Sequence, residues 1–429
     1  MKAVWTSNIV MPELARHLGI PPLGSGGWLS TDLSALNKSG YSVAVCTVYS
    51  GVFEERCFEA GPNRYYVFPP MELARLAEAF QRVLDKEQPD IVQVNGTEFE
   101  LSLAMARVAP KDKLVVSLQG LTYFVLRHYQ SGVPDAYFYD SWCKALLRKA
   151  KLGAVPPEME YNDTKRRSVL ECETLSLTKN VIGRTNWDKA CVRSLNGEAS
   201  YYYCPRILRS GFYAEENRWA LESCRRHTIF ISSAAIAKGA HFVFEALAIV
   251  LKKYPDAVLN IAGQVYTFPT LDQPVQRKSY YEINGYKGYL HKLFDELRLY
   301  GHVNTLGMLS EEEMIRQLRA AHVFVSASSI ENNCNSLCEA MMLGTPSVAS
   351  HVGGVPDLME HKKEGFLYTY NEPEMLAHYI DEIFSDDALA FSFSENARQR
   401  AMEIHNIDKN SERLREIYAA IVHGKGPGL

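Results

Sequence analysis

The chain has 429 residues, of which 47% are hydrophobic, and its formal net charge is −4. This length allows two or three hydrophobic cores, and the charge argues against the strongly basic face that nucleic-acid binding requires. Nine cysteines are scattered without a close CxxC pair, which is typical of reduced thiols rather than disulfides or a zinc site. Pro12, Glu13 and Arg16 interrupt the N-terminus before a long apolar core develops, so we expect no signal peptide or membrane span and a cytoplasmic location.

The first half of the chain predicts alternating strands and helices. We expect strands at 2–9, 41–49, 64–68, 90–94, 113–118 and 181–183, with helices at 29–38 and 71–86. A glycine-rich turn between the first strand and the first helix contains Gly26 and Gly27, which allow backbone N–H groups to approach a ligand. This order is typical of a βαβ unit, although the spacing does not fit a dinucleotide GxGxxG fingerprint.

Polar residues follow three of these strands. Asn95 follows the strand at 90–94, Gln119 follows 113–118, and Arg184 follows 181–183. Because ligands of open parallel sheets bind outside the carboxyl ends of strands, these residues are secondary candidates for ligand binding.

Residues 123–151 interrupt the alternation with aromatic and basic side chains, including Tyr123, Trp142 and Lys151. Such a stretch predicts either an ordinary surface helix with extended lysine side chains or peripheral contact with the inner face of a membrane. Both alternatives remain open.

A polar, irregular segment at 212–226 predicts an interdomain link, after which a second series begins. Strands are expected at 227–233, 257–262, 303–306, 321–326 and 346–350, with helices at 242–253, 310–321 and 396–422. Lys238 and Gly263 lie in loops after the first two strands of this series. We therefore predict an α/β fold of two Rossmann-like domains, 1–220 and 221–429, facing each other across a cleft, with the last helix packing back on the first domain.

The stretch 327–358 holds a loop and a helix between two predicted strands. Glu331 falls in the loop and Glu339 in the first turn of the helix, with Asn335 or Ser336 as N-cap. Free N–H groups at such a terminus attract phosphate. Ser336 and Glu339 also have the spacing of a capping box, which is a purely structural role. The two roles are compatible, since Ser336 can cap while neighbouring N–H groups face a phosphate.

These residues resemble the retaining GT-B glycosyltransferases of family 4. The match consists of Glu331, seven intervening residues and Glu339, then the run EAMMLGTP at 339–346 and GGVPD at 353–357. Weaker matches are Gly26, Gly27, Lys238 and Gly263. The likeness covers both predicted domains and is more specific in the second.

The resemblance implies a nucleotide-sugar donor and gives roles to the matching residues. Glu331 would face the donor sugar near the reacting carbon, Lys238 would hold the diphosphate, and Glu339 would bind the ribose hydroxyls. The N–H groups around Asn335, Ser336 and Leu337 would also hold the diphosphate, with Gly26 and Gly27 closing on it from the other domain.

Two positions depart from the family pattern. An arginine usually lies five residues before the lysine, and here Ser233 occupies that position. One diphosphate contact is therefore missing, and Arg184 is one candidate to replace it. Family members often have a histidine where this chain has Gln119. We therefore expect this chain to recognise the hydroxyls of the donor sugar differently from those members.

We therefore expect a hexosyltransferase-type enzyme that transfers a sugar, with retention, from a nucleotide sugar to a hydroxyl of a glycan or lipid-linked glycan. The resemblance implies no metal or other cofactor, and the sequence has no metal-ligand cluster. The alternatives are a catalytically silent glycan-binding or partner protein with the same fold, which Ser233 keeps open, and a nucleotide-sugar epimerase.

Overall fold

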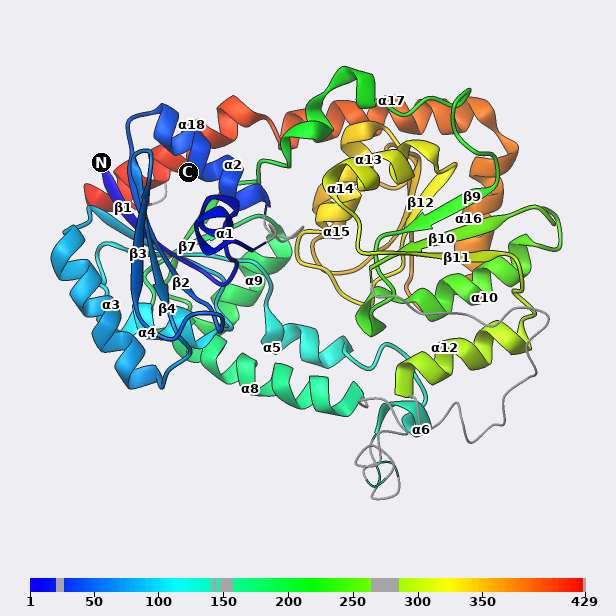
Figure 1. Ribbon diagram of the computed structural model, residues 1–429. Coiled ribbons are helices and arrows are strands. Elements are labelled where there is room, and N and C mark those ends of the chain that lie inside the picture. Colours follow the sequence, from blue (N-terminus) through cyan, green and yellow to red (C-terminus); the bar gives the residue numbers. More distant parts are fainter. Residues whose placement is uncertain are drawn as a thin grey trace. The chain divides into compact units, whose positions relative to one another are not determined.

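The computed structural model describes residues 1–20, 27–139, 157–263 and 285–426, together with Ser141, Lys144 and Leu146 (Figure 1). Within it the chain forms two compact units. Unit 1 contains Met1–Phe124, Lys165–Arg209 and Ile404–Leu429, and unit 2 contains Val125–Thr164 and Ser210–Glu403. Each unit is built on a mainly parallel sheet, which confirms the predicted α/β class with two Rossmann-like domains. Both units are discontinuous in sequence, whereas the predicted domains were continuous.

The unit 1 sheet has eight strands in the order β3-β4-β2-β1-β5-β6-β7-β8. Their bounds are β1 Lys2–Ser7, β2 Ser42–Val48, β3 Arg56–Ala60, β4 Asn63–Phe68, β5 Ile91–Asn95, β6 Leu114–Ser117, β7 Asn180–Gly183 and β8 Ser200–Tyr203. All neighbours are parallel except β3 and β4, which form an antiparallel pair at one edge. The central strand β1 aligns Val4 with Ala44 of β2 and Val92 of β5.

Helices cover both faces of this sheet (Figure 1). The helices α3 Leu73–Glu87, α4 Glu100–Val108, α8 Pro157–Ser176 and α9 Asn186–Leu195 pack on the face that carries Val4. The helices α1 Pro12–Leu18, α2 Gly27–Lys38 and α18 Ile407–Val422 pack on the face of Trp5, since successive strand residues point to opposite faces. Trp5 Nε1 donates a 2.9 Å hydrogen bond to Tyr418 OH, which fastens α18 to the sheet.

The unit 2 sheet has six strands in the order β11-β10-β9-β12-β13-β14, and every neighbouring pair is parallel. Their bounds are β9 Thr228–Ile231, β10 Val258–Ala262, β11 Val303–Gly307, β12 Val323–Ser326, β13 Ser347–Ser350 and β14 Phe366–Tyr368. The long helices are α10 Ala240–Val250, α12 Gly285–Glu296, α13 Glu311–Ala320, α14 Asn335–Leu343, α16 Pro373–Ser385 and α17 Asp387–Ile404. The sequence predicted β9 to β13, α10 and α13, but not β14. The single helix predicted at 396–422 is divided in the structure between α17 and α18.

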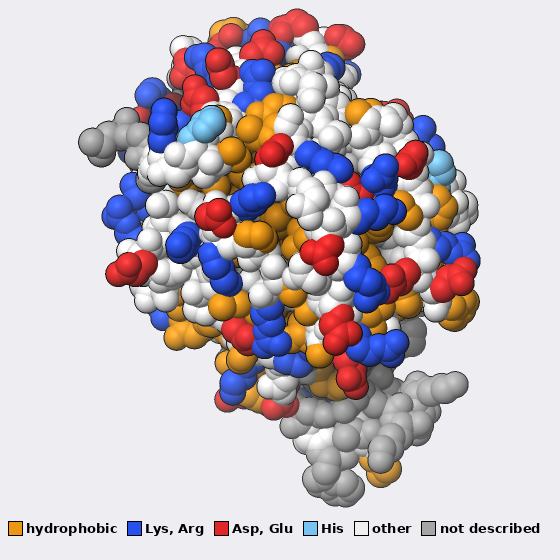
Figure 2. All heavy atoms as spheres, turned by 90° about the vertical axis from the view of Figure 1, so that its left-hand side faces the viewer, with side chains coloured by type: hydrophobic (Ala, Val, Ile, Leu, Met, Phe, Trp, Pro, Cys, Tyr) orange, Lys and Arg blue, Asp and Glu red, His pale blue; other side chains and the backbone are white. Residues whose placement is uncertain are grey.

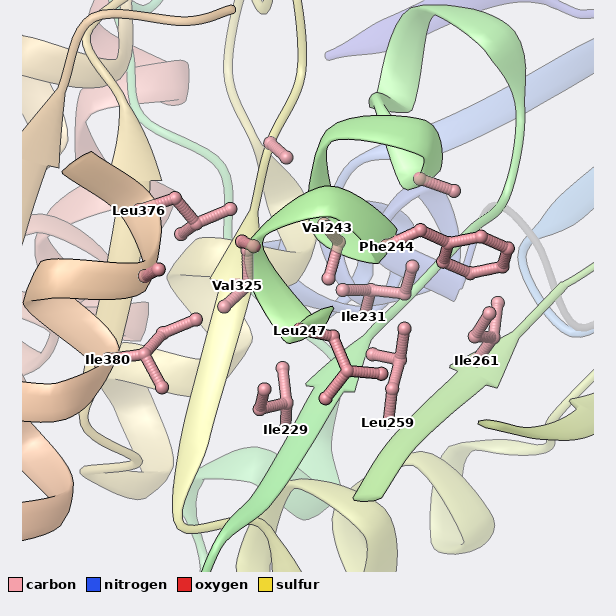
Figure 3. Packing of buried hydrophobic residues seen from close by; sticks show 14 of the residues in the cluster. Ile229, Ile231, Val243, Phe244, Leu247, Leu259, Ile261, Val325, Leu376 and Ile380 are labelled. Carbon is pink, nitrogen blue, oxygen red and sulfur yellow. The ribbon is translucent and has the colours of Figure 1, made fainter. Parts of the chain in front are cut away.

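Figure 3 shows the main core of unit 2. Ile229 and Ile231 of β9 meet Val243 and Leu247 of α10, and Ile380 of α16 completes the same cluster. A short helix, α6 Asp135–Phe138, joins this core through Tyr137, whose ring centroid lies 5.2 Å from that of Tyr289 in α12. The packed face thus fixes β9 and β12, the strands whose carboxyl ends hold the candidate site.

The remaining short elements are helices α5 Thr122–Val125 and α15 Val355–Leu358, and the 3₁₀ helices η1 Leu126–His128, η2 Ser210–Tyr213, η3 Glu215–Asn217 and η4 Ile236–Lys238. On the face drawn in Figure 2, lysine and arginine side chains alternate with carboxylates, in keeping with the small net charge. Among the described residues, we find no helix with the length and apolar character needed to cross a bilayer.

Candidate functional site

Glu331 lies in the loop that follows β12, where the loop after β13 holds its backbone. Gly354 N donates a 3.0 Å hydrogen bond to Glu331 O. Gly353 has a φ of +50°, and a Cβ at this position would lie 2.0 Å from Glu331 O. A side chain is therefore excluded at Gly353, both by its left-handed backbone and by the close approach. The glycines of the run 353–357 thus serve to place Glu331.

Lys238 ends η4, in the loop that follows β9, and this loop packs against the start of the loop after β12. Gly239 has a φ of +69°, and a Cβ there would lie 2.0 Å from Ala327 O. Ser329 N also donates a 2.9 Å hydrogen bond to Ala237 O. The loop after β9 and the loop after β12 therefore pack tightly against each other at the carboxyl edge of the sheet.

This packing brings Lys238 and Glu331, the two predicted catalytic residues, into direct contact. Lys238 Nζ forms an ion pair with Glu331 Oε1, and Ser328 Oγ donates a 2.6 Å hydrogen bond to the same oxygen. Burial lowers the pKa of Lys238, but the charge and hydrogen bond of Glu331 more than offset this, so the pKa lies above its usual value. Lys238 is therefore a cation at neutral pH. Sequence reasoning missed Ser328, because serines near a strand end carry no distinctive signal.

Helix α14 begins beside this pair, but its cap differs from the prediction. The N-cap is Cys334, with no side-chain hydrogen bond at the cap. The predicted cap at Asn335 or Ser336 and the capping box of Ser336 with Glu339 are therefore wrong. The helix starts at Asn335, which places Ser336 at the second helical position and Glu339 in the second turn, beyond reach of the cap backbone.

Because α14 begins earlier than predicted, Asn335, Ser336 and Leu337 are its first three residues. Their N–H groups have no acceptor within the helix, and the helix dipole is positive at this end. Burial and the charge of Glu331 raise the pKa of the Cys334 thiol, while Lys238 lowers it, so the cap lies close to both charges. The N–H groups of the helix terminus and the Lys238 ammonium are thus donors that suit a phosphate, with the Glu331 carboxylate beside them.

Two other predicted donor-binding residues, Glu339 and Gly263, also belong to unit 2. Glu339 is buried in α14. Gly263 follows β10 with a φ of +94°, and a Cβ there would lie 3.4 Å from Ser233 Cα. Ser233 Oγ accepts a 3.2 Å hydrogen bond from Ala235 N, so this side chain shapes the loop that leads to Lys238. Where family members have an arginine, this chain therefore has Ser233, whose hydroxyl stabilises the loop and brings no charge.

Asn95 and Arg184 are engaged in holding the unit 1 sheet together. Asn95 Nδ2 donates to Thr6 O at 3.0 Å, and its Oδ1 accepts from Gln93 Nε2 at 2.9 Å. The buried guanidinium of Arg184 donates to the carbonyl of Leu118 and, at 3.0 Å, to Ser117 Oγ. These contacts give both residues a structural role.

Gln119 lies beside Gly96, and its buried Nε2 has no hydrogen-bond partner within the described part of the chain. Gly27 is the first residue of α2, and Gly26 lies outside the described residues. The structure thus groups Lys238, Glu331 and the start of α14, whereas Asn95, Gln119, Arg184 and Gly27 belong to unit 1.

Sequence reasoning also missed Asp32, a half-buried residue of α2 in unit 1. Burial raises its pKa to about 7, while Arg184 and Arg206 lower it. The Arg206 guanidinium lies 4.0 Å from the ring centroid of Trp28, one helical turn before Asp32. The spacing of Trp28 and Asp32, four residues apart just after the glycine turn, is the signal that could have pointed to this cluster.

Two units, each built on a mainly parallel sheet, are the architecture of the GT-B fold, which this chain shares with solved structures such as WaaG, a glycosyltransferase. Residues 214–400 match the model of the family described as Glycosyl transferases group 1. The matched range includes Lys238, Glu331 and Glu339. Family 4 is one classification compatible with this match.

Several similar proteins are named as glycosyltransferases. The putative glycosyltransferase YtcC of Bacillus subtilis (strain 168) is 26% identical over 199 residues, which is 46% of each chain. The N-acetyl-alpha-D-glucosaminyl L-malate synthase of Bacillus anthracis is 23% identical over 415 residues, covering 93% of this chain and 94% of that protein. In several of these matches, the alignment spans about half the length of the relative. Among solved structures, Anabaena Alr3699/HepE in complex with UDP-glucose has a TM-score of 0.64 at 17% identity, covering 98% of this chain and all of that one, which shows a shared fold.

Proposed function

We propose that this protein is a retaining glycosyltransferase of family 4 that moves a sugar from a nucleotide-sugar donor to a hydroxyl of a glycan or lipid-linked glycan. The observation that carries the proposal is the contact between Lys238 and Glu331 beside the start of α14. A phosphate and a sugar joined to it are the two groups that this arrangement suits, one by charge and the other by hydrogen bonding.

The chemistry follows from the charges at this site. As the bond between the anomeric carbon and the phosphate oxygen breaks, negative charge grows on the diphosphate and positive charge on the sugar. The Lys238 ammonium and the N–H groups of Asn335, Ser336 and Leu337 stabilise the first charge without reorganisation. The Glu331 carboxylate stabilises the second. The acceptor oxygen then bonds to the anomeric carbon, and its proton passes to the leaving phosphate.

We assign the nucleotide of the donor to the part of unit 2 that contains Glu339 and Gly263, next to the ion pair of Lys238 and Glu331. Buried Glu339 is the proposed ligand of the ribose hydroxyls, and Gly263, whose backbone approaches Ser233, is a further proposed donor-binding position. The HepE structure in complex with UDP-glucose supports a nucleotide-sugar donor for a protein of this fold. No metal is part of the proposal, because Lys238 and the helix terminus supply the positive charge.

Acceptor and location are further parts of the proposal. Unit 1 carries Gln119 and Asp32, polar groups that suit an acceptor with several hydroxyls. The malate synthase among the relatives shows by its name that acceptors other than glycans occur on similar chains. Tyr123 and Tyr139 are exposed, which supports peripheral membrane contact at 123–151, although much of that stretch lies outside the described residues.

Calorimetry with UDP-, ADP- and GDP-sugars tests the donor, and NMR of the product's anomeric centre tests retention. We expect one donor family to bind more tightly than millimolar and the product to keep the donor's anomeric configuration. Glu331→Ala and Lys238→Ala should abolish most transfer while the chain stays folded. Failure of every donor to bind would favour a silent glycan-binding protein, and conversion of the donor to its epimer would favour an epimerase.

A further inference from the structure

The ion pair of Lys238 and Glu331 has a consequence for the nucleotide that leaves the site. Both the donor's diphosphate and the Glu331 carboxylate are anions, and both are drawn to the same ammonium. Among the described residues, Lys238 is the one cation that pairs with Glu331. A diphosphate bound at Lys238 must therefore compete with a carboxylate that is already in contact with it.

The two partners are held unequally. The Glu331 side chain is 10% exposed and is also held by Ser328, whereas the Lys238 side chain is 38% exposed. Ser328 is itself fixed, since Ser350 Oγ donates a 2.5 Å hydrogen bond to its carbonyl oxygen. The lysine is thus the partner that can turn away, and Glu331 stays at the edge of the site when it does.

The free-energy cost of weakening the ion pair between Lys238 and Glu331 differs between a bound nucleotide sugar and a bound free nucleoside diphosphate. With a sugar attached, hydroxyls close to Glu331 can donate hydrogen bonds to its carboxylate and offset the weakened ion pair. A free diphosphate carries more negative charge and has no sugar hydroxyl that could bond Glu331, so a largely buried carboxylate is left beside an anion.

We propose that Glu331 competes with the nucleoside diphosphate product for Lys238 and so promotes its release after sugar transfer. This inference rests on the proposed function and gives Glu331 a second role. It predicts that the site binds a nucleotide sugar better than the corresponding free diphosphate, and that the carboxylate of Glu331 causes the difference.

The test compares Glu331→Gln with the wild-type chain by calorimetry, using UDP, ADP and GDP and the matching nucleotide sugars. For the base that the wild type binds, the substitution should lower the Kd of the free diphosphate on the order of tenfold, because a competing charge is removed. The Kd of the nucleotide sugar should stay the same or rise. Lys238→Gln should weaken both ligands.

Glu360→Gln is the matched control. It removes one carboxylate of unit 2 that pairs with an exposed lysine, Lys363, at 3.3 Å. This variant should bind both ligands as the wild type does. If Glu331→Gln fails to fold, Glu331→Ala tests the same loss of charge with a different side chain.

The outcomes separate this inference from the proposed function. If the wild type binds no nucleotide and no nucleotide sugar, the proposed function fails. If the wild type binds and transfers, yet Glu331→Gln binds the free diphosphate no more tightly, the competition is disproved and the glycosyltransferase proposal stands.

Discussion

The Ser328 hydroxyl donates a 2.6 Å hydrogen bond to Glu331 Oε1, the oxygen that also pairs with Lys238. This bond holds the carboxylate in one orientation from the second residue after β12. Removing it in Ser328→Ala should lower kcat roughly tenfold, since one hydrogen bond to a charged group contributes about 1.5 kcal/mol or more. Donor KM should change little, because Lys238 and the helix terminus remain.

Steady-state kinetics with any donor that supports transfer measures kcat and donor KM separately. Ser385→Ala, which removes a hydroxyl from the exposed end of α16, is the control and should leave both constants unchanged. An equal loss in KM and kcat, or no loss at all, would contradict a positioning role for Ser328.

Gly353 controls the same carboxylate through the backbone. Because a Cβ would lie 2.0 Å from Glu331 O, Gly353→Ala must displace the loop that carries Glu331. We expect transfer to fall at least tenfold, with left-handed strain costing roughly 1–3 kcal/mol of stability. Activity assays and urea unfolding measure the two effects.

Gly426→Ala serves as the comparison for Gly353, since nothing lies within 4 Å of a Cβ there and its backbone is not left-handed. It should match the wild type in both assays. Full activity of Gly353→Ala would show that the loop tolerates the shift and that Gly353 does not place Glu331.

Tyr418 ties the last helix to the centre of the unit 1 sheet. Its hydroxyl accepts from Trp5 Nε1 at 2.9 Å and donates to Gln93 Oε1 at 2.7 Å, and all three residues are buried. Tyr418→Phe leaves both partners unsatisfied and should cost about 1–3 kcal/mol of unfolding free energy. Urea unfolding checks this, with the exposed Tyr139→Phe as a neutral control; a loss below 0.5 kcal/mol, roughly the range of surface substitutions, would contradict the predicted cost.

Hydrophobic periodicity predicted most strands of both sheets because buried parallel strands are continuous apolar runs. It missed β3, an exposed edge strand, and the short strands β8 and β14. It also missed α8, whose apolar residues Met159 and Val169 are exposed and give no periodic stripe. It also could not assign 125–164 to unit 2, because that depends on contacts such as Tyr137 with Tyr289 rather than on local pattern.

The candidate site was predicted from a family pattern, whereas its geometry was not. Lys238 and Glu331 are 93 positions apart, and no local signal predicts their ion pair. The capping box of Ser336 and Glu339 has the right spacing, but the helix begins two residues too early for it to form. Spacing alone does not fix where a helix starts, since the cap backbone is set by the packing of the preceding loop.

Two buried histidines should make the chain sensitive to acid. Burial lowers the pKa of His241 and of His405 to about 4, and hydrogen bonds to Ser131 O and Arg206 O offset this only in part. In the unfolded chain an ordinary histidine has a pKa of about 6.5, so between pH 6.5 and 4 the unfolded state binds more protons than the folded state. Stability is therefore complete above about pH 6.5 and is lost as the pH falls toward 4, by roughly 2 kcal/mol for each histidine between pH 7.5 and 5.

His405→Gln keeps a donor for the Arg206 carbonyl, to which His405 Nδ1 lies at 2.8 Å, but it does not titrate. Urea unfolding at pH 7.5 and 5 should show about 2 kcal/mol less loss for this variant than for the wild type. His423→Gln, at an exposed histidine after α18, should behave as the wild type does. An unchanged pH dependence in His405→Gln would show that His405 is not kept neutral by burial and that other groups cause the acid sensitivity.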